Sequence, residues 1–165
     1  MTTRWIDALA VKLRHYPAFD GCALRPATRD DEQYLFELHR AALSEYVDAT
    51  WGWDDDWQRA HFAAHYVPAH NALIVRGALG GAAIGRISLT RHWRKVFLRD
   101  VELIASERNG GIGSGVVNAV LALARDSHRH VELLVLNCNP ARRLYSRLGF
   151  VVIADDGTRL RMRAD

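Results

Sequence analysis

The feature that most constrains the fold of this chain is a glycine-dense stretch between two different kinds of sequence. Residues 108–115 read Arg-Asn-Gly-Gly-Ile-Gly-Ser-Gly. The run 96–105 before them is apolar and strand-like, and the run 112–127 carries apolar residues at helical spacing. Glycines let backbone N–H groups converge on a ligand, and a helix N-terminus adds unpaired donors and a positive dipole end. The stretch predicts a phosphate-binding turn; the alternative is a glycine-rich turn without a ligand.

Spacing separates the known phosphate motifs. A Walker loop needs a lysine and a hydroxyl residue after its last glycine, where this chain has Val116 and Val117. A dinucleotide fingerprint that starts at Gly111 needs glycine or alanine at position 116. The pattern that remains, Arg-x-x-Gly-x-Gly over residues 108–113, resembles the pyrophosphate loop of the GNAT superfamily of acetyl-CoA-dependent N-acetyltransferases.

A second stretch resembles the same family. Residues 139–150 match the GNAT signature Asn-x-x-Ala-x-x-x-Tyr-x-x-x-Gly-Phe from its alanine onward. The family asparagine falls at Cys138, whereas Asn139 lies one residue later, so Asn139 is either shifted by a local bulge or reduced to a helix cap. The likeness covers about residues 22–163, and its details look like a bacterial subgroup of the family.

Composition bounds the class of protein. The 165 residues are 49% hydrophobic and 25% charged, which favours one globular domain. The net charge of +3 comes mostly from dispersed arginines, which suits an anionic cofactor better than a nucleic acid. Cys22 and Cys138 form no metal-binding cluster, so we expect neither a disulfide nor a metal site. Without a signal core or a membrane span, we expect a cytoplasmic protein with no membrane partner.

Periodicity along the chain predicts the element order β-α-α-β-β-β-α-β-α-β-β after an N-terminal helix over residues 3–15. This is an α+β pattern with a mixed central β-sheet flanked by helices, the order of the GNAT-like acyl-CoA N-acyltransferase fold. We expect residues 1–20 to be an appended helix and residues 21–165 a single acetyltransferase domain. A homodimer is compatible with the sequence.

The resemblance implies transfer of an acetyl group from acetyl-CoA to a primary amine of a small molecule, by direct attack in a ternary complex. Tyr145 occupies the family's general-acid position; the alternative is a core tyrosine. Glu102 is the candidate base, directly or through water, because a carboxylate beside Asp100 on an apolar strand should have a raised pKa. Its alternative is a salt bridge with a neighbouring arginine. His92 is a weaker candidate.

The resemblance also implies the ligand contacts. The cofactor acetyl-CoA would contact Leu103, Ile104, Ala105, Arg108, Asn109, Gly110, Gly111, Ile112, Gly113, Ser114 and Asn139. For the acceptor we expect Trp51, Trp53, Asp54 and Asp100, because indole faces attract cations and carboxylates attract ammonium groups. Trp57 is expected on the buried face of its helix. In the alternative, the tryptophans pack the helices together and the aspartates cap them.

Two other functions stay open from the sequence. One is a non-catalytic acyl-CoA-binding or regulatory module on the same fold, which thiol release against a panel of amines would separate from an enzyme. The other is a small basic nucleic-acid-binding domain, which would show retention on DNA with a steep salt dependence.

Overall fold

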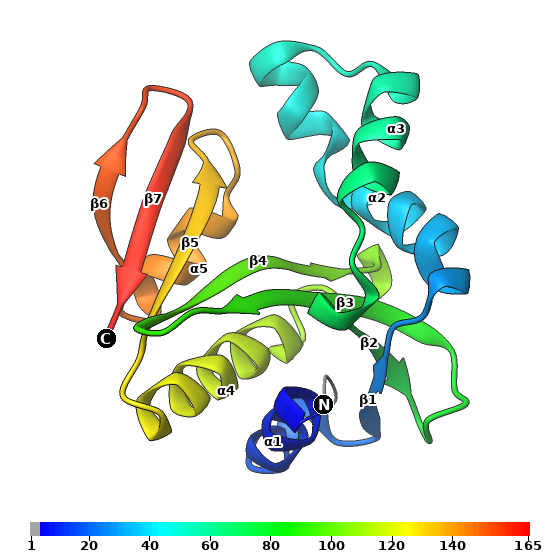
Figure 1. Cartoon of the computed structure of the whole chain (residues 1–165), viewed down its shortest axis with the longest axis vertical. Helices are drawn as coiled ribbons and strands as arrows, with labels where there is room; N and C mark the ends of the chain where they lie inside the picture. Colours follow the sequence, from blue (N-terminus) through cyan, green and yellow to red (C-terminus); the bar gives the residue numbers. More distant parts are fainter. Residues whose placement is uncertain (1–3) are drawn as a thin grey trace.

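The computed structural model describes residues 4–165, which form a seven-stranded sheet with helices on both faces (Figure 1). The strands are β1 (Cys22–Pro26), β2 (Asn71–Arg76), β3 (Ala83–Arg91), β4 (Lys95–Leu103), β5 (His130–Leu136), β6 (Val151–Asp155) and β7 (Arg159–Ala164). Their order across the sheet is β1-β2-β3-β4-β5-β7-β6. Within the described residues β4 and β5 run parallel and every other pair is antiparallel, so the predicted mixed sheet is confirmed.

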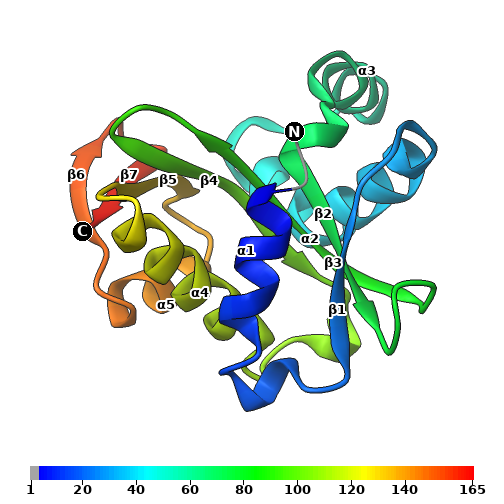
Figure 2. The same cartoon turned by 60° about the horizontal axis from the view of Figure 1, so that its bottom comes forward.

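The helices are α1 (Arg4–Leu13), α2 (Glu32–Trp51), α3 (Asp55–His65), α4 (Ile112–Asp126) and α5 (Ala141–Arg147). Helices α1 and α4 lie on one face of the sheet, and α2 and α3 lie on the other (Figures 1 and 2). The predicted element order is confirmed. Helix α2 extends to Trp51, one turn beyond Val47, where the stripe of apolar residues at helical spacing ends, because Gly52 at φ 84° ends the helix.

Alternate residues of β2 are buried on opposite faces of the sheet. Ala72 and Ile74 join the main core on the α4 side, whereas Leu73 and Val75 join a smaller cluster under α2. All four side chains are at most 1% exposed. Successive strand residues point to opposite faces, so a continuous apolar run predicts a strand buried on both sides.

A β-bulge interrupts the pairing of β3 with β4. Ser88 is opposite Asp100 and Leu89 is opposite Leu98, which leaves Arg99 as an extra residue on β4. The bulge reverses the alternation expected for this strand. Leu98 belongs to the main core on the α4 side, whereas Asp100 has turned to the other face. Strict alternation along residues 96–105 predicts that Leu98 and Asp100 share a face, and the bulge makes this prediction wrong.

Strands β4 and β5 separate along their length. They pair over residues 95–98 and 130–133, and neither residues 99–103 of β4 nor residues 134–136 of β5 continue the ladder between them. Strand β5 pairs instead with β7 over residues 131–136. The divergence leaves two strand edges that face each other without shared hydrogen bonds (Figure 1).

The N-terminal helix is part of the main core. Its buried side chains Trp5, Ile6, Leu9 and Leu13 pack with residues of α4 and β1. The segment after it approaches the glycine-rich turn, where ideal Cβ atoms on Gly111 and Gly115 would lie 3.1 Å from Ala18 and 3.3 Å from Tyr16. Among the described helices, none is both long and apolar enough for a bilayer crossing.

Candidate active site

A group of polar side chains lies on the sheet face that α2 covers. Strand register explains it, because residues directly opposite each other in an antiparallel pair share a face. Arg86 is opposite Glu102, Ser88 is opposite Asp100, and Asn71 is opposite Ser88. Three strands thus build one polar surface next to the small apolar cluster under α2.

Arg86 is the buried cation of this group. Its Nε donates to Oε2 of Glu102 over 2.7 Å, and its Nη2 lies 3.0 Å from Oδ2 of Asp100. Its Nη1 donates to Oδ1 of Asn71 over 3.3 Å, and the guanidinium lies 5.2 Å from the ring centroid of Phe62. Burial opposes the charge, but the charges of Asp100 and Glu102 outweigh burial and raise the pKa of Arg86. Such a charge is tolerated inside a protein because it is paired.

His39 on α2, the helix that covers this face of the sheet, contacts Glu102 of the polar group. Its Nδ1 lies 2.8 Å from Oε1 of Glu102, and its side chain is 19% exposed. Burial disfavours the imidazolium, but the hydrogen bond and charge of Glu102 outweigh burial and raise the pKa of His39 above the ordinary 6.5. Since ionised Glu102 can only accept, Nδ1 carries a proton and Nε2 keeps its lone pair in the neutral ring. The 3.3 Å approach of Arg86 Nη2 to Nδ1 is then a contact of two donors.

The expectation of a raised pKa for Glu102 is wrong. Burial pushes the pKa up, but the Arg86 charge and the His39 hydrogen bond outweigh it and hold the pKa well below its usual range. The alternative weighed from the sequence, a salt bridge with a neighbouring arginine, is what the structure shows. Because both carboxylate oxygens have partners, Glu102 stays ionised and holds His39 in place.

Three of these residues have the geometry of a metal-binding trio. Ligand atoms of His39, Asp100 and Glu102 lie within 4.8 Å of one another. Both carboxylates already contact Arg86. The guanidinium therefore serves as the cation of the cluster.

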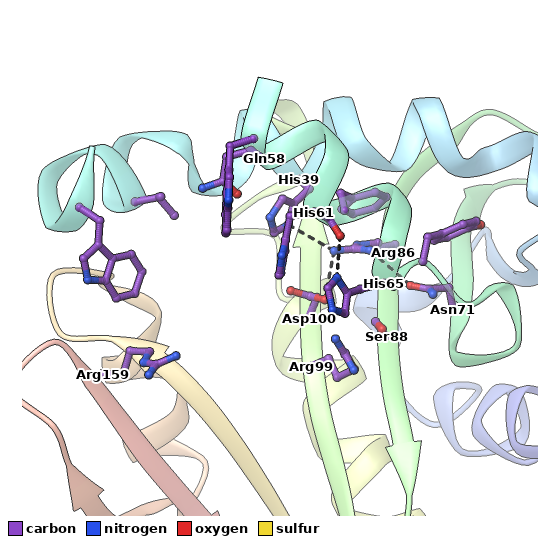
Figure 3. A pocket seen from close by; sticks show the side chains of 15 residues that line it. His39, Gln58, His61, His65, Asn71, Arg86, Ser88, Arg99, Asp100 and Arg159 are labelled. Carbon is purple, nitrogen blue, oxygen red and sulfur yellow. Dashed lines mark hydrogen bonds and ion pairs between the residues drawn. The ribbon is translucent and has the colours of Figure 1, made fainter. Parts of the chain in front are cut away.

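A cavity of about 500 Å³ opens between the polar group and α3 (Figure 3). Its lining includes His39, Val47, Trp51, Trp57, Gln58, His61, Phe62, His65, Tyr66, Asn71, Arg86, Ser88, Arg99, Asp100 and Arg159. The β-bulge explains why consecutive residues Arg99 and Asp100 both line it, since a regular strand would point them to opposite faces.

Aromatic rings of α3 form one wall of this cavity. The Trp57 and His61 rings stack at 4.7 Å between centroids, and the His61 and His65 rings follow at 4.2 Å. The spacing of four residues places these rings on one face of the helix. On the far side, the Arg159 guanidinium lies 5.7 Å from the Trp51 ring centroid, so β7 and the end of α2 meet across the cavity.

The structure divides the residues expected to bind the acceptor. Trp51 and Asp100 line the cavity, whereas Trp53 lies in a separate depression with Arg40 and Ser44. Asp54 caps α3 by accepting from the backbone N–H of Trp57 over 2.9 Å. The expectation that Trp57 is buried is wrong, because its side chain is 57% exposed at the cavity wall.

Tyr145 on α5 lies near the acidic residues of β4. Burial raises the pKa of its phenol to about 12, and the charges of Asp100 and Glu102 add to the shift. Its ring meets Phe150 edge-on with centroids 5.7 Å apart, and it packs against the main core. The phenol therefore stays protonated at neutral pH, as a proton donor must.

The glycine-rich turn has the features of a pyrophosphate cradle. Asn109 and Gly111 have φ values of 63° and 89°, and α4 begins at Ile112 without a side-chain cap. Its first backbone N–H groups are left free for a ligand, since Gly115 N is the first that bonds back to Gly111 O. A Cβ on Gly113 would meet no protein atom within 4 Å. These residues fit a phosphate group of acetyl-CoA.

The backbone before the turn is partly engaged. Nε of Arg108 donates to Leu103 O over 2.9 Å, and Ile104 N donates to Ile84 O over 2.9 Å. The end of β4 is fixed by these bonds, and Ala105 begins a short 3-10 turn. On its other edge, β4 makes no ladder with β5 over residues 99–103.

Asn139 takes a structural position. Its Oδ1 accepts from the backbone N–H of Ala141 over 2.9 Å, at the start of α5. This is the helix-capping geometry that the one-residue offset allowed. Cys138, at the family's asparagine position, instead places Sγ 3.5 Å from both Tyr46 O and Thr50 Oγ1 of α2.

Sequence reasoning missed His39, Arg86 and Arg99. His39 lies among apolar residues of α2, where a histidine has no local signal of function. Arg86 becomes visible only when β3 and β4 are aligned, because it then stands opposite Glu102. Arg99 depends on a bulge that strict alternation does not predict. His92, the weaker base candidate, lies at the β3–β4 turn and contacts Thr90 Oγ1 outside the cavity.

A model of the acetyltransferase (GNAT) family matches residues 33–150. The PaiA N-acetyltransferase of Thermoplasma acidophilum, solved with coenzyme A, has a TM-score of 0.69 at 16% identity and covers 87% of this chain and 98% of its own. An acetyltransferase from Thermus thermophilus has a TM-score of 0.65 at 17% identity, covering 87% of this chain and 96% of its own.

Arabidopsis thaliana Naa50, solved with the bisubstrate analogue CoA-Ac-MVNAL, has a TM-score of 0.58 at 15% identity and covers 88% of this chain and 99% of its own. Comparison with curated protein sequences gave no significant match. The structural neighbours share the fold, and the family model spans most of the chain. The chain therefore belongs to the GNAT family of acetyltransferases, whose cosubstrate is acetyl-CoA.

Proposed function

We propose that this acetyltransferase acetylates the primary amine of a small molecule, with His39 as the base that accepts the amine proton. The observation that carries the proposal is the hydrogen bond from His39 Nδ1 to buried Glu102 at the wall of the cavity. The bond fixes the ring and leaves Nε2 as the basic nitrogen. Asp100 supplies a partly exposed carboxylate that attracts the ammonium form of the acceptor.

Each residue then has one task in amide formation. Acetyl-CoA supplies the thioester carbonyl carbon to which the amine nitrogen bonds while the carbon–sulfur bond breaks. His39 accepts the proton that the amine loses, and ionised Glu102 stabilises the imidazolium that results. Tyr145 donates its phenolic proton to the departing sulfur. Glu102 acts through His39, so it is a positioning residue and not the base itself.

The glycine-rich turn and the separated strands β4 and β5 support the cosubstrate side of the proposal. The turn offers N–H groups for the phosphates, and the facing strand edges offer unpaired backbone groups for the extended arm. Arg108 and Asn139 are also proposed to contact the cofactor, although the Arg108 side chain hydrogen-bonds Leu103 O and the Asn139 side chain hydrogen-bonds Ala141 N.

Thiol release from acetyl-CoA tests the proposal. Amines of several classes, namely polyamines, amino acids, aminoglycosides and peptide N-termini, are supplied to the wild type and to His39→Gln. We expect release with at least one small primary amine in the wild type and a loss of about 10²-fold in the variant. Coenzyme A binding without release against any amine would favour a non-catalytic module instead.

A further inference from the structure

The β-bulge of β4 places two opposite charges side by side at the cavity wall. Arg99 is the extra residue of the bulge, and Asp100 follows it, and both line the cavity (Figure 3). A regular strand would bury one of these side chains on the opposite face or point it away. The local irregularity therefore delivers a cation and an anion to the same short length of wall.

The two charges differ in how well they are paired. Asp100 lies 3.0 Å from Arg86, which is itself shared with Glu102. Arg99 is exposed, and within residues 4–165 it makes no ion pair, side-chain hydrogen bond or aromatic contact. Arg159 also lines the cavity, but its Nε forms an ion pair with Oδ2 of Asp156 over 3.2 Å.

His61 does not supply a second cation to the wall. Burial and the neighbouring His65 and His39 lower the pKa of His61, so its ring is neutral at neutral pH. Its stacked neighbour Trp57 offers a flat apolar face. The wall thus presents one guanidinium without a protein partner among the described residues, one partly exposed carboxylate, and an aromatic surface from α3.

We infer that the acceptor is an amino acid, whose ammonium group binds at Asp100 beside His39 and whose carboxylate binds Arg99. This inference rests on the proposed function. An arginine guanidinium matches a carboxylate with two parallel hydrogen bonds, which gives orientation as well as affinity. Because Arg99 and Asp100 are consecutive, they suit an acceptor whose two charged groups are close together, as in an α-amino acid. The α3 rings would contact an apolar or aromatic side chain.

Three acceptors of the same shape test the inference. L-phenylalanine carries the carboxylate, L-phenylalanine amide replaces it with a neutral group, and phenethylamine lacks it. Thiol release is measured with each, and kcat/KM is expressed per neutral amine so that the different basicities do not decide the result. We expect the amino acid to exceed both others by about 10-fold or more, the effect of a charged hydrogen bond.

Variants assign this preference to Arg99. In Arg99→Gln the selectivity for the amino acid should fall toward parity, through a raised KM, and Arg99→Lys should retain part of it. Arg94→Gln, another exposed arginine of the same hairpin but outside the cavity, is the matched control and should change nothing. Equal kcat/KM for all three acceptors, or full selectivity in Arg99→Gln, would overturn the inference.

A second measurement keeps the two proposals distinguishable. If none of the amines causes the wild type to release thiol, the proposed function fails. Calorimetric titration of L-phenylalanine and of phenethylamine into the protein saturated with coenzyme A then tests the carboxylate site by itself. Tighter binding of the amino acid that Arg99→Gln removes would support the site, and equal or absent binding would reject it.

Discussion

Nδ1 of His39 and Oε1 of Glu102 lie 2.8 Å apart, although 63 residues separate them in the sequence. The contact joins α2 to the middle strand of the sheet at the rim of the cavity. It makes one nitrogen of the ring a fixed donor and the other a free base. The proposed chemistry of the site depends on this pair.

The pH dependence of the reaction follows from the pair. His39 must be neutral to accept a proton, and its pKa is raised above the ordinary 6.5 because Glu102 outweighs burial. The acidic limb of kcat/KM should therefore lie above pH 6.5, with activity rising as the pH passes the raised value. His39→Gln should lower kcat by about 10²-fold and abolish this limb. An unchanged limb in the variant would exclude His39 as the base.

Glu102→Gln should move the acidic limb to lower pH without removing it. The amide no longer stabilises the imidazolium, so the pKa of His39 falls toward or below its ordinary value. If Glu102 itself were the base, the limb would disappear. The variant should also lose about 3 kcal/mol of stability, because buried Arg86 loses one of its two carboxylates. Asp100→Asn is the comparison, with a smaller shift in the same direction.

Tyr145→Phe should lower kcat by about 10²-fold and leave coenzyme A affinity nearly intact, because only the proton donor is removed. The pKa of about 12 means that the phenol contributes no basic limb near neutral pH. Rate profiles and calorimetry on the same preparation check both statements. A variant with full turnover would leave Tyr145 with a packing role.

Gly113→Val should lose most of its coenzyme A affinity and keep its thermal stability. No protein atom lies within 4 Å of the new Cβ, so the added side chain obstructs a ligand at the turn and not the fold. Gly111→Val is a poorer test, because its φ of 89° and the nearby Ala18 would strain the fold itself. Gly80, between β2 and β3, also has no protein atom within 4 Å of an added Cβ, so Gly80→Val should keep normal coenzyme A affinity. Unchanged affinity in Gly113→Val would contradict the cradle.

Trp57→Ala should raise the acceptor KM by about 2- to 10-fold, the range of a lost aromatic contact. Its stability should change by only about 0.5 kcal/mol, because the side chain is 57% exposed. Trp53→Ala is the matched control from the same segment, since Trp53 lies outside the cavity. A raised KM in the Trp53 variant alone would reverse this assignment.

Much of the fold could be predicted from the sequence because its signals are local. Apolar periodicity predicts the strands and helices, and glycines stand just before the start of α4 and just after the end of α5, at positions 111 and 149. The spacing of Thr28 and Asp31 is a local signal of the same kind, since their side chains bond as a capping pair at the start of the helical segment before α2.

The site was harder to predict because it depends on register. Glu102 and Asp100 were visible as acids on an apolar strand, but the sign of the Glu102 pKa shift depends on Arg86 directly opposite it. Strict alternation would place Arg99 and Asp100 on opposite faces, whereas one extra residue in β4 brings both to the cavity. Such a bulge leaves no mark in composition, so only the paired strands reveal it.

The separation of β4 from β5 has a mechanical consequence. Strands β5, β7 and β6, with α5 between β5 and β6, make one leaf of the sheet, and β1 to β4 make another. Within residues 4–165, the ladder that joins the two leaves covers only residues 95–98 and 130–133. Glu102 lies on β4 of the larger leaf, and His39 lies on α2, which packs against β4. Tyr145 lies on α5, in the smaller leaf. The proposed proton acceptor and the proposed proton donor thus lie on opposite sides of the gap between β4 and β5, so a change in the width of this gap would alter their spacing without breaking a strand pair.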